Sequence, residues 1–141
     1  MILNRKSVEL LAPAGNWDAL VAAVEAGADA VYLGGKHFNM RMHRNKETNF
    51  DDAMLKKAIE YTHAHGVHLY ITLNHLISVE EVEPLKKYLL YLNEIKPDAI
   101  LVQDFAVLEL TKELGIDIPL HTSVMMNTHN EHAIKKLKEY G

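Results

Sequence analysis

Residues 27–34 read Gly-Ala-Asp-Ala-Val-Tyr-Leu-Gly: a glycine that suits a helix exit, then Asp-Ala, then a short β-rich run. The same order returns at residues 96–102, which read Lys-Pro-Asp-Ala-Ile-Leu-Val. Both runs are densely apolar, which is typical of strands buried on both faces of a parallel sheet. The repeated junction indicates that the chain is built from copies of one structural unit.

Five such units follow one another, each a β-rich run and then a segment of helical period. The predicted strands are Val8–Ala12, Ala30–Gly34, His68–Leu73, Ala99–Gln103 and Pro119–Ser123. This alternation suits an open doubly wound sheet or a closed barrel. No G-x-G-x-x-G spacing follows the first strand, so dinucleotide binding is not expected. We interpret the fold as α/β, with parallel repeats forming the first five units of a TIM-like (β/α)8 barrel, incomplete in this chain.

The segments between the strands carry helix start and stop signals. The expected starts are Asn16 before 17–26, Asn49 before 50–65, a Ser78–Glu81 capping box, Asp104 or Phe105, and a second box at Thr128–Glu131. Glycines 27, 66 and 115 and Pro97 stand where helices should end. No proline- or serine-rich linker interrupts the series, so no domain boundary is predicted within residues 1–141.

The amino-acid composition limits which classes of protein this chain can belong to. The chain has 141 residues, 48% of them hydrophobic, which suffices for the core of one domain. A net charge of −4 indicates neither a wholesale nucleic-acid binder nor a disordered tail. Cysteine is absent, and no apolar segment follows the charged start at Met1 to Lys6 or reaches the length of a membrane span. We therefore expect a cytoplasmic protein without a membrane partner.

Polar residues follow the predicted strands, where ligands bind in both architectures. The predicted substrate-binding residues are Asn16, Gly34, Gly35, Arg41, Asn74, Gln103 and Asn127, and the predicted catalytic residues are Asp104, His121 and Ser123. Helix capping is the alternative for Asn16 and Asp104, a tight turn for the glycines, and hydrogen bonding to neighbouring backbone for Asn74. His121 and Ser123 lie two apart on one strand and so point to the same side.

The loop from Lys36 to Glu47 is the most basic stretch, with Lys36, Arg41, Arg44 and Lys46 against one acid. At a strand top it could bind a phosphate, a carboxylate or an RNA backbone, with Arg41 as the best bidentate donor. A solvated surface loop is the alternative. Nine histidines are present, but none has the spacing of a metal site, so no metal is predicted within this chain.

Two opening motifs carry a family resemblance. Residues 9–16 read Glu-Leu-Leu-Ala-Pro-Ala-Gly-Asn, and residues 27–35 read Gly-Ala-Asp-Ala-Val-Tyr-Leu-Gly-Gly. Further matches are Phe38 with Arg41, Asn49-Phe50, the 70–74 strand, Gln103-Asp104, and His121 with Ser123 and Asn127. Together they resemble the collagenase-like peptidase family, peptidase family U32. One departure is that Val124 and Met125 stand where relatives usually have Thr-Gln.

The resemblance implies a barrel that continues beyond this chain and a peptidase as the intact protein, acting on a peptide substrate. An alternative it also implies is an RNA- or ubiquinone-precursor-hydroxylating factor whose iron–sulfur cluster is held by downstream cysteines. A third hypothesis is a non-catalytic binding or assembly module. The unpaired first and fifth strands of a five-unit sheet would then seek partners, which predicts a homo-oligomer.

Overall fold

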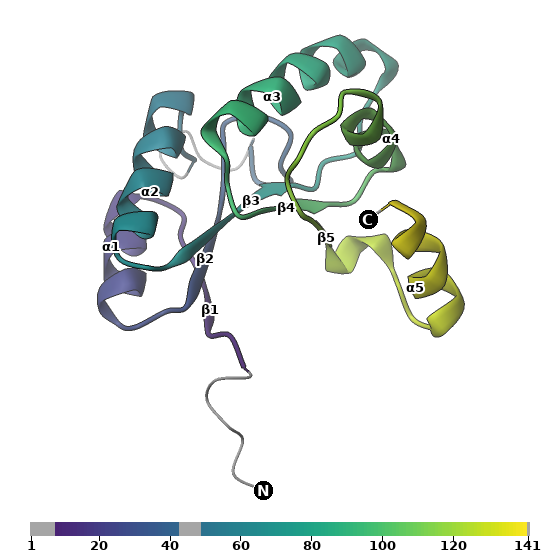
Figure 1. The fold of residues 1–141 in the computed structure, drawn as a ribbon. Helices are drawn as coiled ribbons and strands as arrows, with labels where there is room; N and C mark the ends of the chain where they lie inside the picture. Colours follow the sequence, from purple (N-terminus) through teal and green to yellow (C-terminus); the bar gives the residue numbers. More distant parts are fainter. Residues whose placement is uncertain (1–7, 43–48, 141) are drawn as a thin grey trace, which may run out of the picture.

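The computed structural model describes residues 8–42 and 49–140 (Figure 1). Five parallel strands form one sheet in the order β1-β2-β3-β4-β5. Their bounds are β1 Leu11–Pro13, β2 Ala30–Gly34, β3 His68–Leu73, β4 Ala99–Val102 and β5 Leu120–Thr122. Sequential strands are neighbours throughout, so the five predicted parallel β/α units are confirmed.

The helices cover one face of the curved sheet and leave its concave face open (Figure 1). They are α1 Trp17–Glu25, α2 Asp52–Ala64, α3 Val82–Ile95, α4 Phe105–Glu113 and α5 Glu131–Leu137. Short 3-10 turns lie at η2 Val79–Glu81, η3 Val124–Met126 and η4 Lys138–Tyr140. Among the described residues, none of these helices combines the length and apolar character that crossing a membrane requires.

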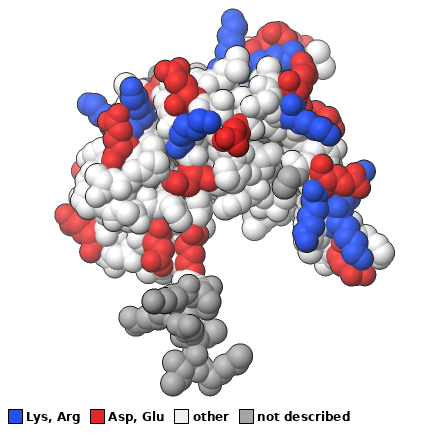
Figure 2. Space-filling model, in the orientation of Figure 1, with Lys and Arg blue, Asp and Glu red and all other residues white. Residues whose placement is uncertain are grey.

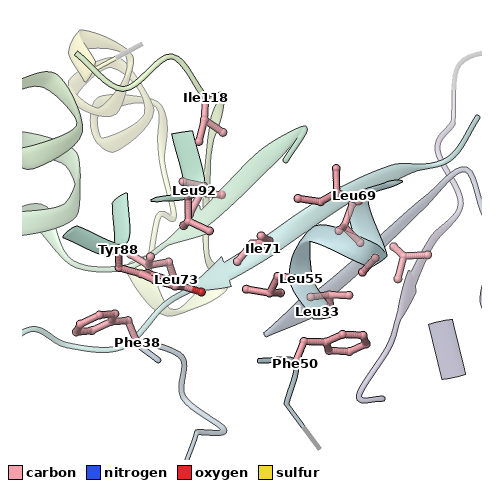
Figure 3. Packing of buried hydrophobic residues seen from close by; sticks show 14 of the residues in the cluster. Leu33, Phe38, Phe50, Leu55, Leu69, Ile71, Leu73, Tyr88, Leu92 and Ile118 are labelled. Atoms are coloured by element: carbon pink, nitrogen blue, oxygen red, sulfur yellow. The ribbon is translucent and has the colours of Figure 1, made fainter. Parts of the chain in front are cut away.

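The core lies between the sheet and the helices (Figure 3). Leu69, Ile71 and Leu73 alternate along β3 toward the helices and are fully buried, as the period of two residues in a strand requires. The intervening Tyr70 belongs to a second, smaller cluster with Ala30 and Ala99 on the concave face. The sheet therefore has one face packed by helices and one that lines an open hollow.

Most predicted helix ends are confirmed. Asn16 caps α1 by accepting a hydrogen bond from the Ala19 N–H at 2.9 Å, and Asp104 caps α4 through the Ala106 N–H at 2.7 Å. Glycines 27, 66 and 115 follow their helices with φ of 87°, 70° and 63°. Glycine takes this left-handed conformation without steric cost, so each residue ends its helix as predicted.

Two predicted caps are wrong. Asp51 caps α2 by accepting from the Met54 N–H at 2.8 Å, because the Asn49 side chain instead donates to the Arg41 carbonyl. At α5, Asn130 accepts from the N–H groups of the next turn, so the helix begins after Asn130 and the box at Thr128 does not form.

Three strands are shorter than predicted. The first begins at Leu11 rather than Val8, the fourth ends at Val102, and the fifth covers only Leu120–Thr122. Strands β1 and β5 lie at the edges of the described sheet, where each has one neighbour rather than two. Each edge strand therefore forms ladder hydrogen bonds on one side only, and it ends where that pairing stops.

Candidate functional site

A cavity of about 980 Å³ lies at the carboxyl ends of the strands. Its polar lining comes from Asn39, Arg41, Asn49, Thr72, Asn74, Thr122 and Ser123, and its other walls from Pro13, Ala14, Gly15, Tyr32, Leu33, Gly34, Met40, Leu101, Val124 and Met125. Within the described part of the chain, these polar groups are amides, hydroxyls and one guanidinium, without a carboxylate. The cavity therefore suits a ligand with an anionic group and hydrogen-bonding edges.

Segment 38–42, which we call the strap, closes one side of this cavity. The Met40 N–H donates to the Asn74 Oδ1 at 3.3 Å, and the Arg41 N–H donates to the Asn39 Oδ1 at 2.9 Å. Asn49 donates from its Nδ2 to the Arg41 carbonyl at 3.2 Å. The strap is thus fixed by three asparagine side chains, of which sequence reasoning named two and missed Asn39.

The predicted substrate-binding residues divide into two groups. Gly34, Arg41 and Asn74 line the cavity. The others lie outside its lining, namely Asn16 at the α1 cap, Gly35 in a bridge to Phe50, Gln103 at the end of β4, and Asn127 after η3. Substrate contact stays a prediction for both groups.

The predicted catalytic residues are also separated. Ser123 lines the cavity and is 7% exposed, with its Oγ accepting from the Met125 N–H at 3.3 Å. Both Asp104 oxygens are engaged by backbone, one by Ala106 and the other by the Ile77 N–H at 2.9 Å. Among the three, only Ser123 belongs to the cavity wall, and the catalytic role of all three remains a prediction.

His121 lies on the open face of the sheet. Its ring contacts the Tyr70 ring edge-on, with centroids 5.0 Å apart. The Tyr70 hydroxyl donates to the Glu9 carboxylate at 2.7 Å. Burial, followed by this hydrogen bond to Glu9, raises the pKa of Tyr70 to about 12, so the phenol keeps its proton well above neutral pH. His121 therefore packs against Tyr70 and lies outside the cavity lining.

Charged side chains of both signs cover the helices in the view of Figure 2, and acids gather at its lower left. No broad basic face is visible among the described residues in this view. Of the predicted basic loop, Lys36 is exposed and Arg41 lines the cavity, whereas Arg44 and Lys46 lie outside the described residues. Arg41 is thus the cation placed at the cavity by the described part of this loop.

The residues of this chain do not fit an iron–sulfur cluster. The chain has no cysteine, and the described residues contain no group of three histidine, cysteine, aspartate or glutamate side chains that could hold a metal. We derive no reaction step through such a cluster. The cluster implied by the resemblance stays a prediction about cysteines outside this chain.

Known proteins are similar to this chain over most of its length. The family model for peptidase family U32 matches residues 15–141. The tRNA hydroxylation protein P of Helicobacter pylori is 36% identical over 87% of this chain. The 23S rRNA 5-hydroxycytidine C2501 synthase of Escherichia coli is 33% identical over 100% of this chain. The chain spans only 29% and 20% of these two relatives.

A solved structure, of the U32 peptidase Mk0906, matches with a TM-score of 0.73 at 12% identity, covering 93% of this chain and 54% of that one. At this identity the match shows the fold alone. The expectation of a peptidase is corrected by the sequence relatives, whose names specify hydroxylation of tRNA and synthesis of a hydroxylated cytidine in rRNA. These names favour the RNA-hydroxylation alternative.

Proposed function

Because this chain belongs to peptidase family U32 and has relatives named for RNA hydroxylation, we propose that it forms part of an RNA-hydroxylating protein. Its share of the work is to bind the RNA at the cavity at the carboxyl ends of the strands. The observation that carries this proposal is the cavity lining, which among the described residues combines one arginine with amides and hydroxyls and has no carboxylate.

This lining has the chemistry that a single nucleotide requires. A guanidinium binds a phosphate through two parallel hydrogen bonds, so Arg41 is the phosphate contact. Thr72, Thr122 and Asn49 offer hydroxyls and an amide, which can both donate to and accept from the edge of a base. An unstacked base in RNA exposes these edges, whereas a paired base hides them.

Apolar side chains also line the same cavity. Leu101, Val124 and Met125 line it, and the Val124 side chain is 92% exposed. Apolar and aromatic surfaces hold the face of a base that has left its stack. Val124 and Met125, the two positions at which this chain departs from the family pattern, therefore supply an apolar surface for the ring of the base rather than polar contacts.

The test is the nucleoside content of RNA in the source organism. Deleting the gene for the intact protein is expected to remove one hydroxylated nucleoside, detected by mass spectrometry of separately digested tRNA and rRNA. The wild-type gene should restore it, whereas Arg41→Gln should reduce it at least tenfold. Lys36→Gln is the matched control, because Lys36 is exposed and lies outside the cavity lining. An unchanged nucleoside profile in both RNA fractions would refute the proposal.

A further inference from the structure

Asn39 is the most deeply buried polar side chain of the strap, with 2% of its surface exposed. Its Nδ2 donates to the Gly35 carbonyl, and its Oδ1 accepts from the Arg41 N–H at 2.9 Å. One amide therefore links the end of β2 to the main chain of the residue that carries the guanidinium. A buried amide with both ends paired is costly to replace, because each lost partner leaves a polar group without a hydrogen bond.

The strap is also held from the core side. Phe38 has a φ of 57° and is buried beside Tyr88, with ring centroids 5.6 Å apart (Figure 3). Its carbonyl accepts from the His75 N–H at 3.1 Å. The left-handed residue turns the chain so that the Phe38 side chain enters the core while Arg41 reaches the cavity.

Gly34 supplies the space that this arrangement needs. A Cβ at this position would lie 3.0 Å from the Asn39 Cγ and 3.0 Å from the Thr72 Oγ1. Both contacts are tighter than ordinary van der Waals packing. The glycine at the end of β2 therefore allows the Asn39 amide to lie directly against the strand.

We propose that Asn39 is the positioning residue for Arg41, fixing the strap so that the guanidinium is presented to the cavity before a ligand arrives. The anionic ligand rests on the proposed function, whereas the positioning itself rests on the hydrogen bonds of Asn39. Preorganisation of this kind lowers the ordering cost of binding. It also predicts that Asn39 acts on the ligand through Arg41 and not by direct contact.

The first test needs no ligand. Amide hydrogen exchange of the Arg41 N–H is compared in the wild-type chain and in Asn39→Ser, whose side chain is too short to span Gly35 and Arg41. Protection of Arg41 should fall about tenfold, the effect of losing a hydrogen bond of roughly 1.4 kcal/mol. Asn93→Ser is the matched control, because the Asn93 Oδ1 also accepts a backbone hydrogen bond, from Asp117 at 3.1 Å, far from the strap in sequence.

Unchanged protection of Arg41 in Asn39→Ser, or an equal loss in Asn93→Ser, would overturn the proposal. The second test titrates inorganic phosphate against the same chains and follows by NMR the backbone amide signals of the strap and of Asn74, which the Arg41→Gln variants retain. Asn39→Ser should weaken phosphate binding at least threefold, and Asn39→Ser with Arg41→Gln should bind no more weakly than Arg41→Gln alone. Additive losses would contradict action through Arg41.

Failure of the two proposals can be told apart. If the wild-type chain shows no phosphate effect at Arg41 but loses Arg41 protection in Asn39→Ser, the positioning role stands and the phosphate contact of the proposed function fails. If phosphate binds at Arg41 and is unaffected by Asn39→Ser, the phosphate contact stands and the positioning role fails.

Discussion

Replacing Gly35 by alanine should destabilise the chain through one identified clash. Gly35 follows β2, and a Cβ added there would lie 2.4 Å from the Tyr88 hydroxyl oxygen and 3.1 Å from the Leu55 Cδ1. Both neighbours are buried, at 6% and 0% exposure, so neither can move into solvent. Overpacking of this kind costs about 1–3 kcal/mol. We expect Gly35→Ala to lower the free energy of unfolding by about 2 kcal/mol.

The second change removes the clashing atom. Among the described residues, the Tyr88 hydroxyl has no hydrogen-bond partner, and burial raises the pKa of Tyr88. Tyr88→Phe therefore deletes an unsatisfied polar atom and should be near neutral by itself. The next Tyr88 atom, Cζ, is 3.5 Å from the added Cβ, which is an ordinary contact. In the Tyr88→Phe background, Gly35→Ala should cost about 1 kcal/mol less than in the wild type.

Urea unfolding of the wild type, both single variants and the double variant, followed by circular dichroism, measures this coupling. Tyr91→Phe is the control, because the Tyr91 hydroxyl donates to the Asp52 carbonyl and is not among the atoms near the added Cβ. Additivity of Gly35→Ala and Tyr88→Phe within about 0.3 kcal/mol, or the same relief from Tyr91→Phe, would refute the clash as the cause.

Three other measurements test local features of the fold. Asp98→Ala should lower the free energy of unfolding in urea by about 1–3 kcal/mol, because the Asp98 Oδ2 accepts from the Leu69 N–H at 2.7 Å and lies 2.9 Å from the His63 Nε2. The control Asp117→Ala, at an exposed residue, should leave this free energy nearly unchanged. The pKa of Tyr70 is raised to about 12, so its contribution to the free energy of unfolding is complete below pH ~10 and is lost as the pH rises toward 12. In Tyr70→Phe, the urea midpoint should therefore fall less steeply over this pH range than in the wild type. Light scattering should show dimers or larger species, since β1 and β5 are sheet edges among the described residues; a monomer contradicts this.

Strands β2 and β3 could be predicted with their exact bounds because both sequences are densely apolar, whereas β4, which is also an inner strand, ends one residue before its predicted end. Ala30–Gly34 and His68–Leu73 lie inside the sheet, and nearly every residue is apolar or packed. The ends of the edge strands β1 and β5 could not be predicted from composition. Each edge strand has one neighbour, so its ladder ends wherever that neighbour stops pairing with it. Local composition at Val8 is β-rich, yet Val8 is 57% exposed and has no strand partner among the described residues.

The place of the cavity, at the carboxyl ends of the strands, could be predicted from the sequence, but only some of its lining residues could be named. Strand tops converge in any parallel sheet, so Arg41, Asn74 and Ser123 could be named from their place after a strand. Asn39 could not, because an asparagine in a loop is ordinary turn chemistry until the loop is known to be buried. The cap at Asp51 was missed because Asn49 and Asp51 are both suitable capping residues, and only the structure shows that Asp51 accepts from the helix while Asn49 donates to the Arg41 carbonyl.

The paired glycines at the end of β2 illustrate why a sequence motif and its cause can differ. Neither Gly34 nor Gly35 has a positive φ, so backbone freedom does not explain them. Successive strand residues face opposite sides, and a Cβ on Gly34 would meet Asn39 at the cavity while one on Gly35 would meet Tyr88 of α3. The motif therefore allows two side chains to approach one strand end from both faces. Gly34 lines the cavity itself, and it also leaves room for the Asn39 side chain that holds the strap.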